Sequence, residues 1–134
     1  MKISAEEIES LKRGIRQLER DKRRRVWYHL TDKSNLESIK KRGLLPSGRV
    51  LGVYGFGEAS LEDIEGKIFL GSTKEEALRQ LRINRFIGLP IPSKEDRVLL
   101  QVRLPEGYEV GRDDNNYAYV EDPIPPEYLK VVTI

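Results

Sequence analysis

Residues 26–44 read VWYHLTDKSNLESIKKRGL and carry two structural signals in immediate succession. The β-branched and aromatic residues of the segment 26–31 are typical of a β-strand. The polar residues that follow indicate a turn and then a short helix, which Gly43 is expected to end. We therefore expect a strand, a turn and a helix within this one segment.

The single histidine of the chain, His29, lies near the end of the expected strand. An imidazole at the end of a strand, just before a helix begins, is well placed to face a ligand. The alternative is a histidine whose two ring nitrogens are satisfied by hydrogen bonds within the fold. The residues alone leave both roles open.

The same segment resembles the opening motif of the ADP-ribosyltransferase-like superfamily, through Tyr28-His29-Leu30-Thr31, Asn35-Leu36, Ser38-Ile39 and Gly43-Leu44. Its members include poly(ADP-ribose) polymerases, DNA-modifying ADP-ribosyltransferase toxins and RNA 2′-phosphotransferases. Two later pieces are also similar: residues 66–70 to a strand motif of the family, and residues 117–129 to its last motif. The resemblance covers roughly residues 26–134.

The resemblance implies an α+β fold in which two split antiparallel β-sheets lie around an NAD cleft. The expected order of elements is a helix, a strand, a helix, a loop, a strand, a helix and then several strands. This order fits the α+β class better than the strict alternation of a doubly wound sheet. We expect residues 1–25 to add an amphipathic basic helix to an ADP-ribosyltransferase-like domain of residues 26–134.

The resemblance also implies an activity, the transfer of ADP-ribose from NAD to a protein or nucleic-acid acceptor. His29 is then expected to contact the ribose of NAD. The other residues that the resemblance suggests for nucleotide binding are Tyr28, Thr31, Arg49, Tyr54, Phe69 and Tyr117.

A carboxylate is useful in this reaction because it can bind the ribose hydroxyls beside an oxocarbenium-like centre or polarise the acceptor. The family's glutamate position falls on Tyr117 in this chain, and the nearest carboxylates are Glu109, Asp114 and Glu121. We favour Glu121 as the catalytic residue because it shares a strand face with Tyr117 and Tyr119. A non-catalytic module that binds nucleotides or a partner on the same fold is the alternative.

The segment before Trp27 predicts a long helix. Ser4 and Glu7 fit a capping box, and the helix is expected to continue to about Arg24. Its apolar residues recur at spacings of three, four and three, as Ile8, Leu11, Ile15 and Leu18. We expect this apolar stripe to pack on its own domain, with pairing in a dimer or a mobile arm as alternatives.

Arg23, Arg24 and Arg25 form a basic run at the end of this helix. Such a run suits the negative pole of a helix C-terminus. It could also hold a phosphate backbone, which keeps a nucleic-acid-associated protein as a further alternative.

Composition excludes several kinds of site. The chain has 134 residues, a net charge of +2, one histidine and no cysteine. It therefore lacks a disulfide, a thiolate nucleophile, and a cysteine or multi-histidine metal site within one chain, so we expect no metal cofactor. We see no signal peptide and no membrane-spanning run, and we expect a cytoplasmic protein without a membrane partner. The oligomeric state stays open.

The later part of the chain predicts further elements from their local patterns. They are a helix from the Ser72 and Glu75 capping box to about Asn84, a strand over residues 97–104, a short strand over 108–110, a turn over 111–116, a strand over 117–121 and a closing strand over 128–134.

Overall fold

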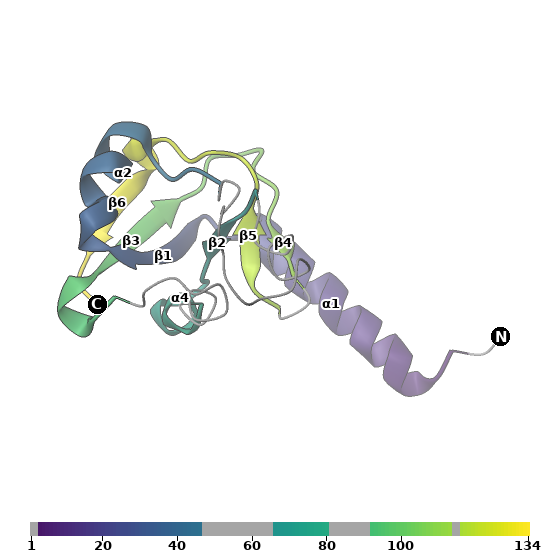
Figure 1. Ribbon diagram of the computed structural model, residues 1–134. Coiled ribbons are helices and arrows are strands. Elements are labelled where there is room, and N and C mark those ends of the chain that lie inside the picture. The colour runs from purple at the N-terminus through teal and green to yellow at the C-terminus, as the bar shows by residue number, and fades with distance from the viewer. Residues whose placement is uncertain (1–2, 47–65, 81–91, 114–115) are drawn as a thin grey trace.

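The computed structural model describes residues 3–46, 66–80, 92–113 and 116–134. These residues form two small antiparallel sheets with helices around them, which confirms the α+β class (Figure 1). The helices are α1 (Ala5–Arg23), α2 (Leu36–Arg42) and α4 (Lys74–Arg79), with single 3₁₀ turns at Lys33–Asn35, Lys94–Asp96 and Pro126–Tyr128. The strands are β1 (Val26–Asp32), β2 (Ile68–Leu70), β3 (Arg97–Arg103), β4 (Gly111–Arg112), β5 (Ala118–Val120) and β6 (Leu129–Val132).

The two sheets each have three strands, in the orders β1-β3-β6 and β2-β5-β4. In the first sheet β1 pairs with β3 along its whole length, with His29 opposite Leu100. In the second sheet Phe69 lies opposite Tyr119, and Tyr119 lies opposite Gly111. Neither sheet is wide enough to form a core alone, so each depends on the other and on the helices.

The main core lies between the two sheets and α2. Its buried residues are Trp27, Ile39, Leu44, Ile68, Leu70, Leu100, Val102, Leu104, Ala118, Val120 and Ile124. A second, smaller cluster lies on the other face of the first sheet, where Leu30 and Leu99 meet Ala77 of α4. The first sheet is therefore covered on both faces, because side chains alternate between them along each strand.

The end of α2 explains the glycine at position 43. Gly43 has a φ of +76°, and a Cβ built on it would lie 2.0 Å from the carbonyl oxygen of Ile124. Directly after it, Leu44 and Ile124 exchange two backbone hydrogen bonds of 2.9 Å each. The glycine thus lets the chain leave the helix and pair at once with the segment before β6.

Two local predictions were wrong, each by a small displacement. Residues 108–110 form no strand, and the short strand is β4, within the segment expected to be a turn. Gly111 pairs with Tyr119 in this strand, and the ring of Tyr119 lies so close that a Cβ at position 111 would approach a ring carbon to 2.7 Å. The second capping residue is Thr73, not Ser72, since the Thr73 hydroxyl accepts the hydrogen bond from the N–H of Glu76. That helix also ends earlier than predicted, at Arg79 with Gln80 as its C-cap, and Asn84 itself lies outside the described residues.

Helix α1 begins as predicted, with the Ser4 hydroxyl accepting a hydrogen bond from the N–H of Glu7. The expectation that its apolar stripe packs on the domain is wrong. Ile8, Leu11, Ile15 and Leu18 are between 42% and 59% exposed. Figure 1 shows the reason, because most of α1 extends away from the two sheets and only its C-terminal end meets them.

The C-terminal end of α1 is held by a nearly buried ion cluster. Asp21 is 4% exposed, and both of its carboxylate oxygens accept hydrogen bonds of 3.0 Å from the guanidinium of Arg112. The same guanidinium donates to Glu76 of α4 at 2.8 Å and lies 5.8 Å above the ring centroid of Trp27. Arg112 therefore joins α1, α4 and β4 to the core tryptophan.

The pKa of Glu76 reflects this cluster. Burial by itself would raise the pKa of its carboxyl. Hydrogen bonds from the hydroxyl and N–H of Ser72, together with the charge of Arg112, outweigh burial and lower the pKa below its usual value of 4.5. The carboxylate is therefore ionised at neutral pH and balances part of the charge of Arg112.

Replacing Arg112 with alanine should lower the free energy of unfolding by about 3 kcal/mol, because it leaves two nearly buried carboxylates without their cation. Chemical denaturation followed by circular dichroism measures this change. The matched control is Arg23→Ala, which removes an exposed ion pair to Glu19 on the same helix and should change stability by less than about 0.5 kcal/mol. Equal effects of the two substitutions would contradict a structural role for the cluster.

Candidate functional site

The two sheets separate at His29, and this point is the candidate site. Tyr28 and Gly71 exchange two backbone hydrogen bonds, of 2.8 Å and 2.7 Å, which join β1 to the end of β2. A continuous antiparallel ladder would next pair Leu30 with Phe69. Instead, the carbonyl oxygen of Phe69 lies 2.7 Å from the Nδ1 atom of His29. The imidazole thus donates to a carbonyl that would otherwise accept a backbone hydrogen bond from β1. The two sheets diverge from this point.

This hydrogen bond fixes the protonation state of His29. A carbonyl oxygen only accepts, so Nδ1 must carry the proton that is donated to it. Burial of the ring lowers the pKa of His29 below 6.5, and outweighs the hydrogen bond to Phe69, which acts in the opposite direction. The ring is therefore neutral at pH 7, with a lone pair on Nε2 that can accept a hydrogen bond from a hydroxyl. The side chain is only partly buried.

The side chain of Phe69 lies on the face of the second sheet that points away from the core. Its ring meets Tyr119 edge-on, with 6.3 Å between ring centroids and an angle of 64° between the ring planes. The ammonium group of Lys67 lies 4.7 Å from the Tyr119 centroid. Tyr119 and Lys67 were not among the site residues predicted from sequence, although Tyr119 lies midway between Tyr117 and Glu121 on the same strand face.

The remaining predicted site residues fall in different places. Tyr28 lies on the opposite face of β1 from His29 and packs with the cluster under α4. Thr31 is buried, and its hydroxyl accepts a hydrogen bond from the Asn35 amide at 3.0 Å, which ties the end of β1 to the following turn. Tyr117 is partly exposed, while Glu121 is exposed directly after β5.

Some of the predicted residues have no described position. Arg49 and Tyr54, suggested for nucleotide binding, and Asp114, an alternative carboxylate, lie outside the described residues. The structure therefore links His29 to the backbone of Phe69 and the Phe69 ring to Tyr119, while Arg49 and Tyr54 have no described position.

The described part of the chain contains neither a metal-binding group of side chains nor a helix that could cross a membrane. Within residues 3–46, 66–80, 92–113 and 116–134, no group of three or more histidine, aspartate or glutamate side chains is arranged to hold a metal ion. No helix among the described elements combines the length and the apolar character that crossing a bilayer requires.

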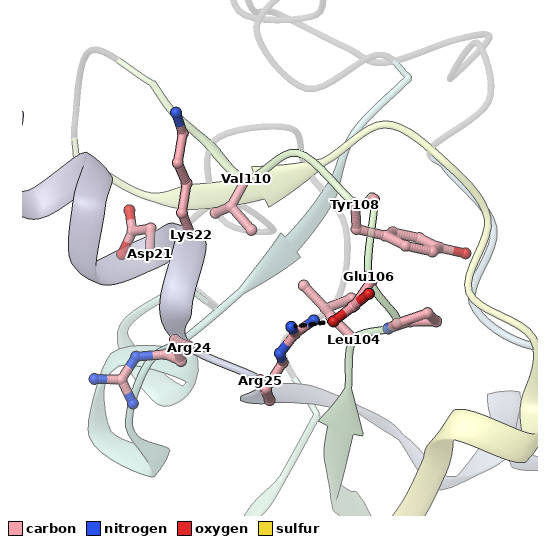
Figure 2. A pocket seen from close by; sticks show the side chains of 10 residues that line it. Asp21, Lys22, Arg24, Arg25, Leu104, Glu106, Tyr108 and Val110 are labelled. Carbon is pink, nitrogen blue, oxygen red and sulfur yellow. Dashed lines mark hydrogen bonds and ion pairs between the residues drawn. The ribbon is translucent and has the colours of Figure 1, made fainter.

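A cavity of ≈ 220 Å³ lies at the end of α1, away from His29 (Figure 2). It is lined by the end of the basic helix and by the loop between β3 and β4, where Arg25 donates to Glu106 at 2.9 Å. Figure 2 shows Lys22 and Arg24 pointing in different directions from the helix end.

The three arginines of the basic run make separate contacts within the protein. Arg23 pairs with Glu19 along the helix, and Arg25 pairs with Glu106. Arg24 donates to the carbonyl of Ser72 and lies 5.6 Å above the Trp27 ring centroid. Each of the three arginines thus has a partner within the protein, and phosphate-backbone binding by this run stays a prediction.

No family model matches this sequence, and no curated protein is significantly similar to it. The interpretation of the site therefore depends on the geometry of the described residues.

The single histidine allows a direct test of the Nδ1–H form. Nitrogen NMR should show one imidazole that is protonated on Nδ1 and titrates below pH 6.5. The pKa of His29 is lower in the folded state than in the unfolded state. The contribution of His29 to the free energy of unfolding is therefore fully present above pH 6.5, and it decreases as the pH falls from there toward the folded-state pKa. His29→Asn should lose this part of the pH dependence. A proton on Nε2, or a pKa above 6.5, would contradict the assignment.

Proposed function

We propose that this protein binds NAD where its two sheets separate, as an ADP-ribosyltransferase-like protein, and transfers ADP-ribose to a protein or nucleic-acid acceptor. The observation that carries the proposal is the neutral His29 ring, which the Phe69 carbonyl orients at the split between the sheets. The proposal also uses the resemblance of residues 26–44, 66–70 and 117–129 to the motifs of that superfamily.

A ribose suits His29 chemically. A ribose hydroxyl can donate a hydrogen bond to the Nε2 lone pair, while the Nδ1–H remains bonded to Phe69. A fixed tautomer and a fixed ring plane reduce the entropy lost when a ligand is positioned. The histidine thus acts as an oriented acceptor, and its low pKa keeps the acceptor available at neutral pH.

The exposed aromatic face of the second sheet supports a nucleotide as the ligand. Phe69 and Tyr119 offer flat apolar surfaces for a planar ring. Lys67, on the same face, adds positive charge that suits a ligand with two phosphates. These groups lie on strands of the second sheet, whose edge strand β2 also supplies the Phe69 carbonyl to His29.

The reaction would break the bond between nicotinamide and ribose, which passes through an oxocarbenium-like centre. Glu121 is the carboxylate that we assign to this step, where it would bind ribose hydroxyls or polarise the acceptor. Its position directly after β5 leaves it open to solvent and to a large acceptor.

Nucleotide binding can be separated from the structural role of His29 by two substitutions. His29→Asn places an amide nitrogen near the Nδ1 position, so it keeps a donor for the Phe69 carbonyl but removes the Nε2 acceptor. We expect it to retain most of the stability and to weaken NAD binding by about three- to tenfold, the value of one neutral hydrogen bond. His29→Ala removes both the donor and the acceptor, so it should lower both the stability and the affinity for NAD. Isothermal titration calorimetry and thermal unfolding measure the two properties.

Unchanged NAD affinity in both His29 variants would contradict the assignment of the ribose to His29. A lack of NAD-induced thermal stabilisation in the unmodified protein would contradict nucleotide binding altogether.

Turnover tests the catalytic assignment of Glu121. Glu121→Gln should weaken NAD binding by less than about tenfold, because an amide can still hydrogen-bond ribose hydroxyls, and slow nicotinamide release or ADP-ribosyl transfer by about 10²- to 10⁴-fold. Glu109→Gln is the matched control, because Glu109 is another exposed carboxylate near the second sheet, and it should be nearly as active as the original chain. Mass spectrometry of the nicotinamide released and of modified acceptors provides the readout.

The opposite pattern, with Glu109→Gln inactive and Glu121→Gln active, would overturn the choice of carboxylate. Binding of NAD without any turnover would instead identify a non-catalytic nucleotide-binding module on this fold.

A further inference from the structure

The apolar stripe of α1 has no cover within the described structure. Ile8, Leu11, Ile15 and Leu18 lie along one side of a helix of 19 residues, and each is at least 42% exposed. A stripe of four large apolar side chains on a projecting helix is unusual for a protein that works alone, since such patches usually mark an interaction site. The body of the protein contacts the helix elsewhere, through Asp21.

The order of residues in the stripe indicates what covers it. With Ile8 as position a of a heptad, the two isoleucines occupy a positions and the two leucines occupy d positions. Isoleucine at a with leucine at d favours parallel two-stranded coiled coils, because each residue type packs well at its position in that geometry. The stripe is therefore complementary to a copy of itself.

We propose that two copies of this chain associate through their α1 helices as a short parallel coiled coil. The occupant of the stripe is thus the same stripe of a second copy, and the association follows a two-fold axis along the helices.

Charges beside the stripe favour the parallel direction. In a parallel pair, the g residue of one helix meets the e residue of the next heptad on its partner. This places Glu7 next to Lys12 of the second copy, twice in the dimer, as an attractive pair. An antiparallel pair with the same core layers would place Lys12 opposite Lys12, and Glu7 near Asp21. The charges beside the stripe therefore attract in a parallel pair of helices and repel in an antiparallel pair.

The attachment of the body leaves room for this dimer. Asp21 occupies a g position and is bonded to Arg112, so the body lies beside the stripe and not over it. The two-fold axis of a parallel pair then places the two bodies on opposite sides of the coil. Figure 1 shows the N-terminal part of α1 well away from both sheets, where a second helix can approach.

Disulfide trapping tests the direction, because the chain has no cysteine of its own. Equivalent d positions face each other in a parallel coil, within the range of about 4.4–6.8 Å between Cα atoms that a disulfide needs. Leu11→Cys should therefore form covalent dimers with itself under mild oxidation. Arg13→Cys, on the outer side of the helix, is the matched control and should stay monomeric.

Trapping between Leu11→Cys and Ile15→Cys in a mixture, in preference to Leu11→Cys with itself, would overturn the parallel arrangement. Equal trapping of Arg13→Cys would show random collision and would overturn the interface.

Sedimentation equilibrium tests the dimer without cross-links. The chain should show a concentration-dependent mass that approaches two copies between about 10 μM and 1 mM, a range that suits a coil of only four core layers. Leu11→Lys should weaken the dimer by more than about tenfold, because it places a like-charged pair in the core. A single-copy mass over the whole range, for the original chain, would overturn the proposal.

A charge exchange tests the pairing of Glu7 with Lys12. Glu7→Lys and Lys12→Glu should each weaken self-association, and an equal mixture of the two variants should recover it as a mixed dimer. Circular dichroism confirms that both variants keep the helix. Absence of recovery in the mixture, with both helices intact, would overturn the assigned register.

Discussion

The hydrogen bond between His29 and the Phe69 carbonyl determines how the two halves of this protein meet. The strands β1 and β2 join at Tyr28 and Gly71 and would continue as a ladder if backbone groups alone decided their pairing. The imidazole satisfies the next carbonyl with a side-chain donor. The backbone can then diverge without leaving that partly buried acceptor unpaired, which would destabilise the fold. Two narrow sheets replace one wide sheet, and the core forms between them.

This arrangement also connects structure with the proposed chemistry. The side chain that allows the sheets to separate is the same one that we assign to the ribose. Because its Nδ1–H is committed to the fold, its Nε2 is the atom available to a ligand, and the lowered pKa keeps that nitrogen neutral. A structural histidine and a binding histidine are therefore not exclusive alternatives here, although the sequence suggested a choice between them.

Much of the fold could be predicted from local sequence because the signals lie within a few residues. The strand at Val26, the helix that Gly43 ends and the helix that Ser4 caps were all located correctly. β4 could not be predicted, because this strand of two residues is defined by its pairing with Tyr119 and Ala118 of β5 and not by a local pattern. The partner of Asp21 could not be predicted either. Arg112 lies 91 residues away, and no local pattern distinguishes it from a surface arginine.

The candidate site was predictable only in part, for a similar reason. The sequence placed His29 in the correct strand but near its end, whereas β1 continues to Asp32 and His29 lies at its middle. The acceptor of its hydrogen bond is a backbone carbonyl, which every residue carries, so no pattern of side chains identifies Phe69 as its partner. The alternation of side chains placed Tyr28 on the opposite face from His29, which a list of motif residues cannot show.

The pairing of β1 with β3 has a consequence for the way this protein is made. Val26 pairs with Arg103, and β3 in turn pairs with β6, so the first sheet joins residues 26–32 to the C-terminal part of the described chain. During synthesis β1 leaves the ribosome before β3 and β6 have been made. Trp27 is therefore not yet buried at that stage. Contacts between such distant residues close large loops and slow folding. Formation of the first sheet is therefore a late step, because it requires β3 and β6 from the later part of the chain.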